Sequence, residues 1–169
     1  MVVLTVVSAI PIADAVRPGV SRSGSKASPC RARDFNLGVF RSFAPTASAP
    51  TYAQVLEWIR RYQETSQPDS INNPVAKGIN NHPEYGRDMG NNLHRALLCL
   101  HLATFTDAQK ITLLSHLAAI ADDVVSRFEE GAVVLGGGGG NQWKKPVVAV
   151  CAAALGAKAP ASWLTWLSF

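Results

Sequence analysis

The residues best suited to catalysis lie close together between positions 81 and 87. They are Asn81, His82, Tyr85 and Arg87. Proton removal beside a carboxylate, as in β-elimination from a uronic acid, needs amide or cationic groups to neutralise that carboxylate. It also needs a base such as His or Tyr. These residue types match that reaction and predict a catalytic group. The alternative is a structural turn, because asparagine tolerates turn conformations.

Other polar residues extend this candidate site along a predicted helix. On an ideal helix of about 3.6 residues per turn, Arg87, Asn91, His94 and His101 share one sector, which could line a cleft. We predict Asn80, Asn91 and His94 as ligand-binding residues. The structural alternative is that these side chains bond loop carbonyls and water along an exposed edge. For His101 we expect a hydrogen-bonded core residue.

A second candidate site follows five successive glycines at positions 136–140. The order departs from a phosphate-binding loop, which needs Lys followed by Ser or Thr directly after its last glycine. Free N–H groups at a helix start, with Lys144 and Lys145, predict a more general site for carboxylate, sulfate or phosphate. A flexible connector is the alternative, because ordering five glycines costs much conformational entropy.

Composition limits the classes of protein that the chain can belong to. Its 169 residues are 47% hydrophobic and 17% charged, which suits a domain with a buried core. The net charge is +4, and the basic residues form no dense Lys/Arg stripe along the sequence. Nucleic-acid binding is therefore not predicted. Cys30, Cys99 and Cys151 are widely spaced, so no metal site is predicted, and no cofactor either. No stretch has the about 18 apolar residues that span a membrane.

Residues 1–50 are predicted to be an extended or irregular segment, since Pro18, Pro29, Pro45 and Pro50 interrupt any helix. Phenylalanines near position 40 indicate that this segment lies against a surface. The apolar run 2–10 is rich in β-branched residues and predicts a short buried strand. A signal peptide is the alternative, although it normally begins with positive charge. The localisation therefore stays open.

Residues 51–169 are predicted to form a helical domain, and the fold class is mainly α, built of antiparallel helical hairpins. Apolar residues recur at helical spacing in each segment. Thr51 is the predicted N-cap of the first helix, and Thr106 with Gln109 forms a capping box for the third. Leu98 and Leu102 lie opposite the core stripe of the second helix, which predicts a helix covered on all sides. The predicted helices span 52–64, 87–103, 107–130, 147–155 and 161–169.

The last helix is rich in apolar residues and has no polar end. Trp163, Trp166, Leu167 and Phe169 predict an exposed apolar patch. Such a patch predicts a fragment of a larger protein, or docking onto a protein partner or a second copy through Trp163 and Trp166.

Several short motifs support a family resemblance: Arg17-Pro18-Gly19, Phe40-Arg41-Ser42-Phe43-Ala44-Pro45, the segment from His82 to Asp88, and the segment from Gly137 to Pro146. This order resembles a region of large, mostly uncharacterised bacterial and phage-related proteins, which implies no particular activity. The helical half resembles part of the α/α toroid of alginate-lyase-like and heparinase-like polysaccharide lyases. That resemblance implies an acidic polysaccharide ligand, with Asn81, His82, Tyr85 and Arg87 around the uronate. A complete toroid needs several more hairpins, so the ring would be partial.

Two functions follow from the sequence. The first is a non-catalytic helical scaffold or interaction module, favoured by the absence of a complete catalytic signature. The alternative is an acidic-polysaccharide-binding or lyase-like domain that acts on uronate-containing glycans.

Overall fold

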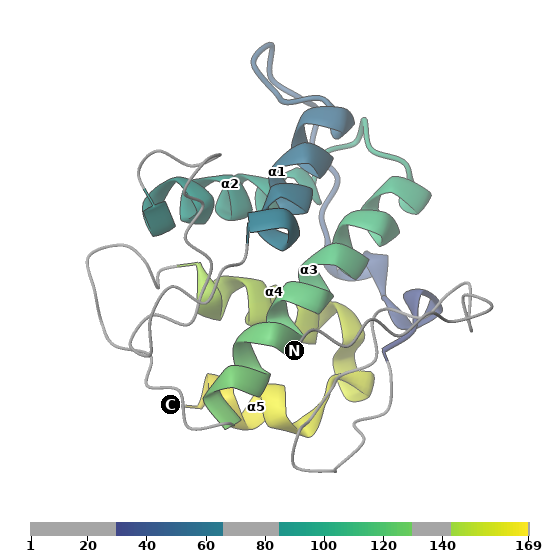
Figure 1. Ribbon diagram of the computed structural model, residues 1–169. Coiled ribbons are helices and arrows are strands. Elements are labelled where there is room, and N and C mark those ends of the chain that lie inside the picture. The colour runs from purple at the N-terminus through teal and green to yellow at the C-terminus, as the bar shows by residue number, and fades with distance from the viewer. Residues whose placement is uncertain (1–29, 66–84, 130–142, 169) are drawn as a thin grey trace, which may run out of the picture.

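The longest helix, α3 (Asp107–Glu129), lies at the centre of the fold (Figure 1). The computed structural model describes residues 30–65, 85–129 and 143–168. Helix α3 packs against α1 (Tyr52–Thr65), α4 (Lys144–Leu155) and α5 (Ala161–Leu167), and α2 (Tyr85–Cys99) packs against α1 and α4. The described residues include no strand, which confirms the mainly helical fold class. The predicted strand at 2–10 lies outside them, and the toroid stays a prediction.

Helix α3 is buried on more sides than its sequence pattern predicts. The apolar residues at helical spacing predict one stripe, made of Ile111, Leu114, Leu117, Ala118, Ala121, Val124, Val125 and Phe128. Most of this stripe is buried, with Leu114 and Leu117 fully inaccessible. Leu113 and Ile120, which lie off that stripe, are buried as well. Since neighbouring helices pack on α3 from several directions, it is the central helix of the core and not a surface helix with one apolar face. The predicted end of this helix at residue 130 lies outside the described residues.

Helix α2 is partly exposed, so the prediction that it is covered on all sides is wrong. Leu93 is fully buried, and Ala96, Leu97 and Leu100 are also buried as expected. Leu98, in contrast, is 70% exposed, and Asn91 and Arg95 are exposed too. The neighbours α1 and α4 cover only the face that carries Leu93. Arg95 lies 4.4 Å from the centroid of the Trp58 ring, which adds a cation–π contact between α2 and α1.

The segment before α1 is held against the helices by backbone hydrogen bonds. Phe43 donates to the carbonyl of His101 and accepts from the amide of Ala103, both at 2.8 Å, in an isolated parallel bridge. Near the short helices η1 (Ala32–Asp34) and η2 (Leu37–Val39), the Asn36 amide donates to the Ala154 carbonyl of α4 at 2.7 Å. Phe35 is buried, so the prediction that this segment lies against a surface is confirmed.

Both α1 and α3 begin with reciprocal capping boxes. The backbone N–H of Gln54 donates to Thr51 Oγ1 at 3.3 Å, and the side-chain Oε1 of Gln54 accepts from the backbone N–H of Thr51 at 2.9 Å. In α3 the same two bonds join Gln109 and Thr106, at 3.2 and 2.9 Å. Each box satisfies backbone N–H groups that have no partner inside the helix. The predicted N-cap and capping box are therefore confirmed.

Helix α4 ends where its sequence predicts, and α5 differs from its prediction. Gly156 has φ of 54°, a left-handed conformation that favours glycine, and ends α4 before η3 (Gly156–Lys158). In α5, Trp163 is 1% exposed and Trp166 is 5% exposed. The prediction that these two residues form an exposed patch is wrong, because both pack into the molecule's own core. Leu164, between them, is 54% exposed.

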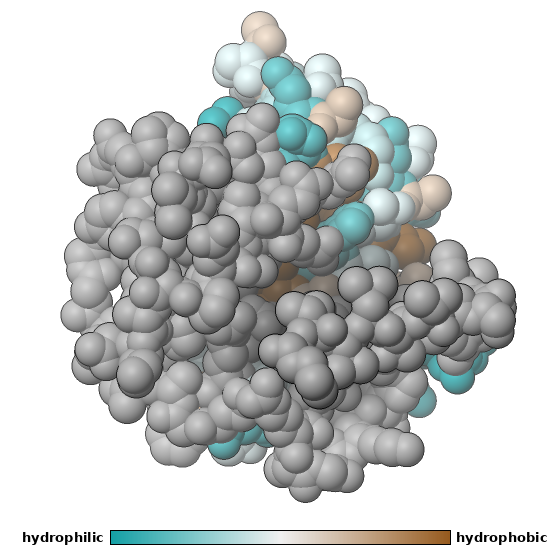
Figure 2. Space-filling model, viewed as in Figure 1, coloured by the Kyte–Doolittle hydropathy of each residue, from teal (hydrophilic) through white to brown (hydrophobic). Residues whose placement is uncertain are grey.

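The hydropathy of the visible surface agrees with the burial of the apolar core (Figure 2). Where described residues are visible on the face in Figure 2, most of them are hydrophilic or of intermediate hydropathy, and a few apolar residues lie between them. No helix among the described residues has the length and hydrophobicity needed to cross a membrane.

Two leucines of α2 test this fold by substitution. Leu93→Ala removes a fully buried side chain, so we expect the free energy of unfolding to fall by about 2–5 kcal/mol. Leu98→Ala in the same helix changes an exposed side chain and should shift it by no more than about 0.5 kcal/mol. Urea unfolding followed by circular dichroism measures both. Equal losses from the two substitutions would contradict the placement of α2.

Candidate functional site

The predicted catalytic residues lie mostly beyond what the structure describes. Asn80, Asn81 and His82 are outside the described residues. Tyr85 and Arg87 belong to the first turn of α2, but their side chains are outside the described part as well. The catalytic group around uronate therefore stays a prediction.

Four of the predicted ligand-binding residues, all except Asn80, come from two helices that touch. A Cβ atom at Gly90 of α2 would lie 3.1 Å from Trp143 Cδ1, directly before α4. Asn91 is exposed and His94 is half-buried, in the turns that follow Gly90. This contact brings the second turn of α2 against the start of α4.

The two lysines at the start of α4 differ sharply in exposure. Lys144 is 2% exposed, and its Nζ lies 5.9 Å from the centroid of the Trp143 ring. Lys145 is exposed. Of the predicted pair, Lys145 is thus the residue that solvent and ligands can reach.

His101 is not on α2, as the sector argument expected, because α2 ends at Cys99 and His101 lies in the following turn. Its ring contacts Phe40 edge-on, with centroids 5.4 Å apart, and Phe43 at 6.0 Å. Its Nδ1 atom is buried and has no hydrogen-bond partner among the described residues. The expectation of a hydrogen-bonded core histidine is therefore wrong for that atom. The ring serves as an aromatic contact between the N-terminal segment and the turn.

The three cysteines are free and buried, and none is activated as a nucleophile. Burial raises the pKa of Cys30 to about 11, with smaller contributions from the negative charges of Asp122 and Asp34. Burial raises the pKa of Cys151 more strongly than that of Cys30. It also raises the pKa of Cys99. Reactive cysteines have lowered pKa values, so these thiols act as small apolar side chains. No cluster of His, Cys, Asp or Glu within the described ranges could hold a metal ion.

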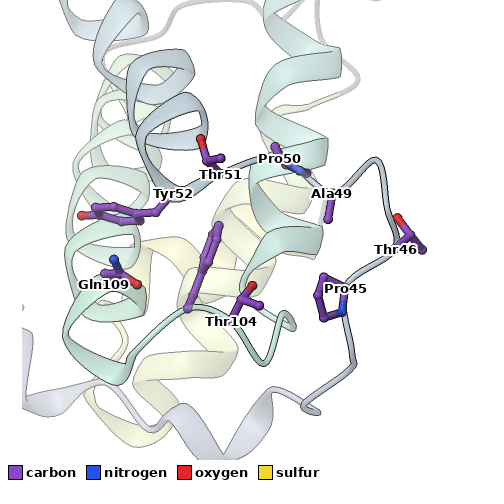
Figure 3. A pocket seen from close by; sticks show the side chains of 9 residues that line it. Pro45, Thr46, Ala49, Pro50, Thr51, Tyr52, Thr104 and Gln109 are labelled. Carbon is purple, nitrogen blue, oxygen red and sulfur yellow. The ribbon is translucent and has the colours of Figure 1, made fainter.

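A pocket that the sequence does not predict lies where α1 and α3 begin (Figure 3). It has a volume of about 340 Å³ and is formed by the segment before α1, the first residues of α1, and the connector from α2 into α3. We call it the connector pocket. Its lining residues are Pro45, Thr46, Ala49, Pro50, Thr51, Tyr52, Thr104, Phe105 and Gln109.

The connector pocket has a buried floor and an exposed rim. Phe105 is 5% exposed, and Tyr52 and Gln109 are half-buried. Thr46 and Thr104 on the rim are exposed. The rings of Tyr52 and Phe105 meet edge to face, with centroids 5.8 Å apart and planes at 85°. The pocket is thus a built concavity that opens to solvent.

The lining of the connector pocket suits recognition better than catalysis. It offers threonine hydroxyls, one amide, two prolines and two aromatic rings. It includes no carboxylate, imidazole, thiol, ammonium or guanidinium group. Such a lining can bind and orient a ligand through its hydroxyls, its amide and its rings.

The sequence feature related to this pocket is a Thr-x-x-Gln pattern that occurs at both helix starts. Thr51 and Gln54 follow the same Thr-x-x-Gln pattern as Thr106 and Gln109. The pattern predicts two helix starts, but not that they lie side by side.

Comparison with known proteins finds no matching family, no matching curated protein and no matching solved structure. The resemblance to bacterial and phage-related proteins and to polysaccharide lyases therefore stays a prediction. Function must be argued from the geometry of the chain.

The raised thiol pKa values predict slow alkylation of the native protein. At pH 8 the native thiols should react with iodoacetamide far more slowly than the three thiols of the urea-unfolded chain. The thiolate is the reactive form, and the pKa of Cys30 is about 11, so its alkylation rate should rise about tenfold per pH unit between pH 8 and 10. Mass spectrometry of the alkylated peptides measures each site. Rapid alkylation of any native cysteine at pH 7 would refute this account.

Proposed function

We propose that this chain is a non-catalytic helical interaction module that binds a partner in the connector pocket. The observation that carries the proposal is the lining itself, which combines rings, hydroxyls and an amide without a charged side chain. Ligand pockets are typically concave, mostly apolar and oriented by a few polar groups. The connector pocket has these three properties.

The rigidity of the pocket walls supports binding. Both helix starts are held by reciprocal capping bonds. Pro45 and Pro50 restrict the backbone of the segment that runs from the Phe43 bridge to the start of α1. A preformed site loses little conformational entropy when a ligand binds, which favours affinity.

The second candidate function is binding or cleavage of an acidic polysaccharide. It is supported by the contact of Gly90 with Trp143, which joins the second turn of α2, the helix that carries Asn91 and His94, to the residue directly before α4, the helix that carries Lys145. The cation of Lys145 would attract a uronate. The described residues that line the connector pocket include no cation, so a uronate would not be attracted there. The two functions therefore use different surfaces.

A displayed library of random peptides tests the interaction module. Panning on the folded protein should enrich peptides whose binding is abolished by Thr104→Phe, because a bulky ring at the exposed rim fills the pocket. Thr165→Phe places the same ring on the exposed face of α5 and should leave binding within twofold of the original. The readout is the Kd of synthetic copies of the enriched peptides, measured by fluorescence anisotropy. No enrichment, or equal losses from both substitutions, would reject the proposal.

The polysaccharide function makes a separate prediction. Incubation with alginate or heparan-type substrates should produce new ultraviolet absorbance from unsaturated uronates, and His82→Ala and Tyr85→Phe should each remove it. A lyase reaction needs a base at one of these positions. Absence of product, or product that is unchanged in both variants, excludes the cleavage reaction.

A further inference from the structure

We infer that the connector pocket receives a proline-containing peptide segment in the extended polyproline II conformation. This inference rests on the proposed interaction module and names the chemistry of its partner.

The charge of the pocket selects a neutral ligand. No cationic or anionic side chain among the described residues lines it, so a charged group would lose hydration without gaining an ion pair there. Each capping box also leaves fewer donors for an anion at its helix start, because the N-cap amide donates to the Gln Oε1 atom and the Gln backbone amide donates to the Thr Oγ1 atom. Asp107, exposed in the first turn of α3, adds a negative charge close by.

The rings of the pocket suit a prolyl ring. Tyr52 stands edge to face on the buried Phe105 and is itself half-buried, so one part of its ring remains open to a ligand. Pro45 and Pro50 add rigid apolar surface on the opposite wall (Figure 3). Proline-rich segments dock into grooves lined by aromatic residues, since the polyproline II helix is preformed and loses little entropy.

The apolar wall also distinguishes a prolyl segment from a neutral sugar. A sugar ring carries hydroxyls around its edge, and each buried hydroxyl needs a partner. The side chains of Pro45, Ala49 and Pro50 offer none. A prolyl residue has no N–H group, so burying it against these side chains leaves no donor unsatisfied.

The free donors of the pocket match the carbonyl groups of such a peptide. The Oε1 atom of Gln109 is held by the Thr106 amide at 2.9 Å, which fixes the orientation of the whole carboxamide. The Gln109 Nε2 donors have no acceptor among the described residues. Thr104 adds an exposed hydroxyl on the rim. Polyproline II segments have no internal hydrogen bonds, so their carbonyls are available to both groups.

The size of the pocket fits a short segment. Its volume of about 340 Å³ lies at the lower end of the about 300–1,000 Å³ found for ligand pockets. A few consecutive residues would therefore occupy it, with the rest of the partner outside. Affinity for an isolated peptide should accordingly be modest.

A titration with acetylated, amidated hexaproline tests this inference. In amide NMR spectra of the labelled full chain, the amides of Tyr52, Thr104, Phe105 and Gln109 should shift saturably. Tyr52→Ala should weaken the Kd by about tenfold or more, as loss of an aromatic anchor does at binding sites. Thr104→Phe, at an exposed position that leaves the core unchanged, should have the same effect, and Thr165→Phe should have none.

A hexapeptide of alanine and glycine and the neutral sugar maltohexaose serve as matched probes. Neither should shift these four amides saturably. The inference fails if hexaproline causes no saturable shift, if either matched probe binds equally well, or if Thr104→Phe leaves the hexaproline Kd unchanged. Enriched library peptides that occupy the pocket but lack proline would overturn this inference alone, and the proposed interaction module would stand.

Discussion

The burial of α3 is the constraint on which the rest of the structure depends. A helix with leucines on several sides, such as Leu113, Leu114 and Leu117, cannot leave any broad face in water. Each fully buried leucine contributes about 1.5–3 kcal/mol relative to an exposed one. Helices α1, α4 and α5 and the N-terminal 3₁₀ helices therefore all pack on α3. The same demand accounts for the burial of Trp163, which the end of the chain contributes to this core.

The connector pocket is a consequence of this arrangement. Because α1 packs on α3 and each begins with its own capping box, two rigid helix starts come together. The Phe43 bridge holds the segment before α1 against the turn that leads into α3. The space between these walls is lined by neutral groups, and its floor is Phe105. The elements that form the connector pocket are thus the same ones that cover the core.

Local signals were predictable from the sequence, and long-range contacts were not. The start of α1 after Thr51, the capping box at Thr106 and the end of α4 at Gly156 each depend on residues within a few positions. The exposure of Leu98 and the burial of Trp166 depend on which other helices cover them, and hydrophobic spacing does not contain that information. The connector pocket joins residues 45–52 to residues 104–109, so no single segment reveals it. The predicted catalytic residues around His82 lie outside the described residues and are untested.

Native-state hydrogen exchange gives the most direct test of the central claim, that α3, buried on several sides, organises the molecule and its pocket. The amides of residues 113–125 should exchange slowest of all, at a rate set by global unfolding, because their hydrogen bonds lie inside the core. The Thr51 and Thr106 amides, each held by a glutamine, should exchange more slowly than those of the exposed rim residues Thr46 and Thr104. If α3 exchanges as fast as the short helix α5, or if the two capped amides are unprotected, the account is contradicted.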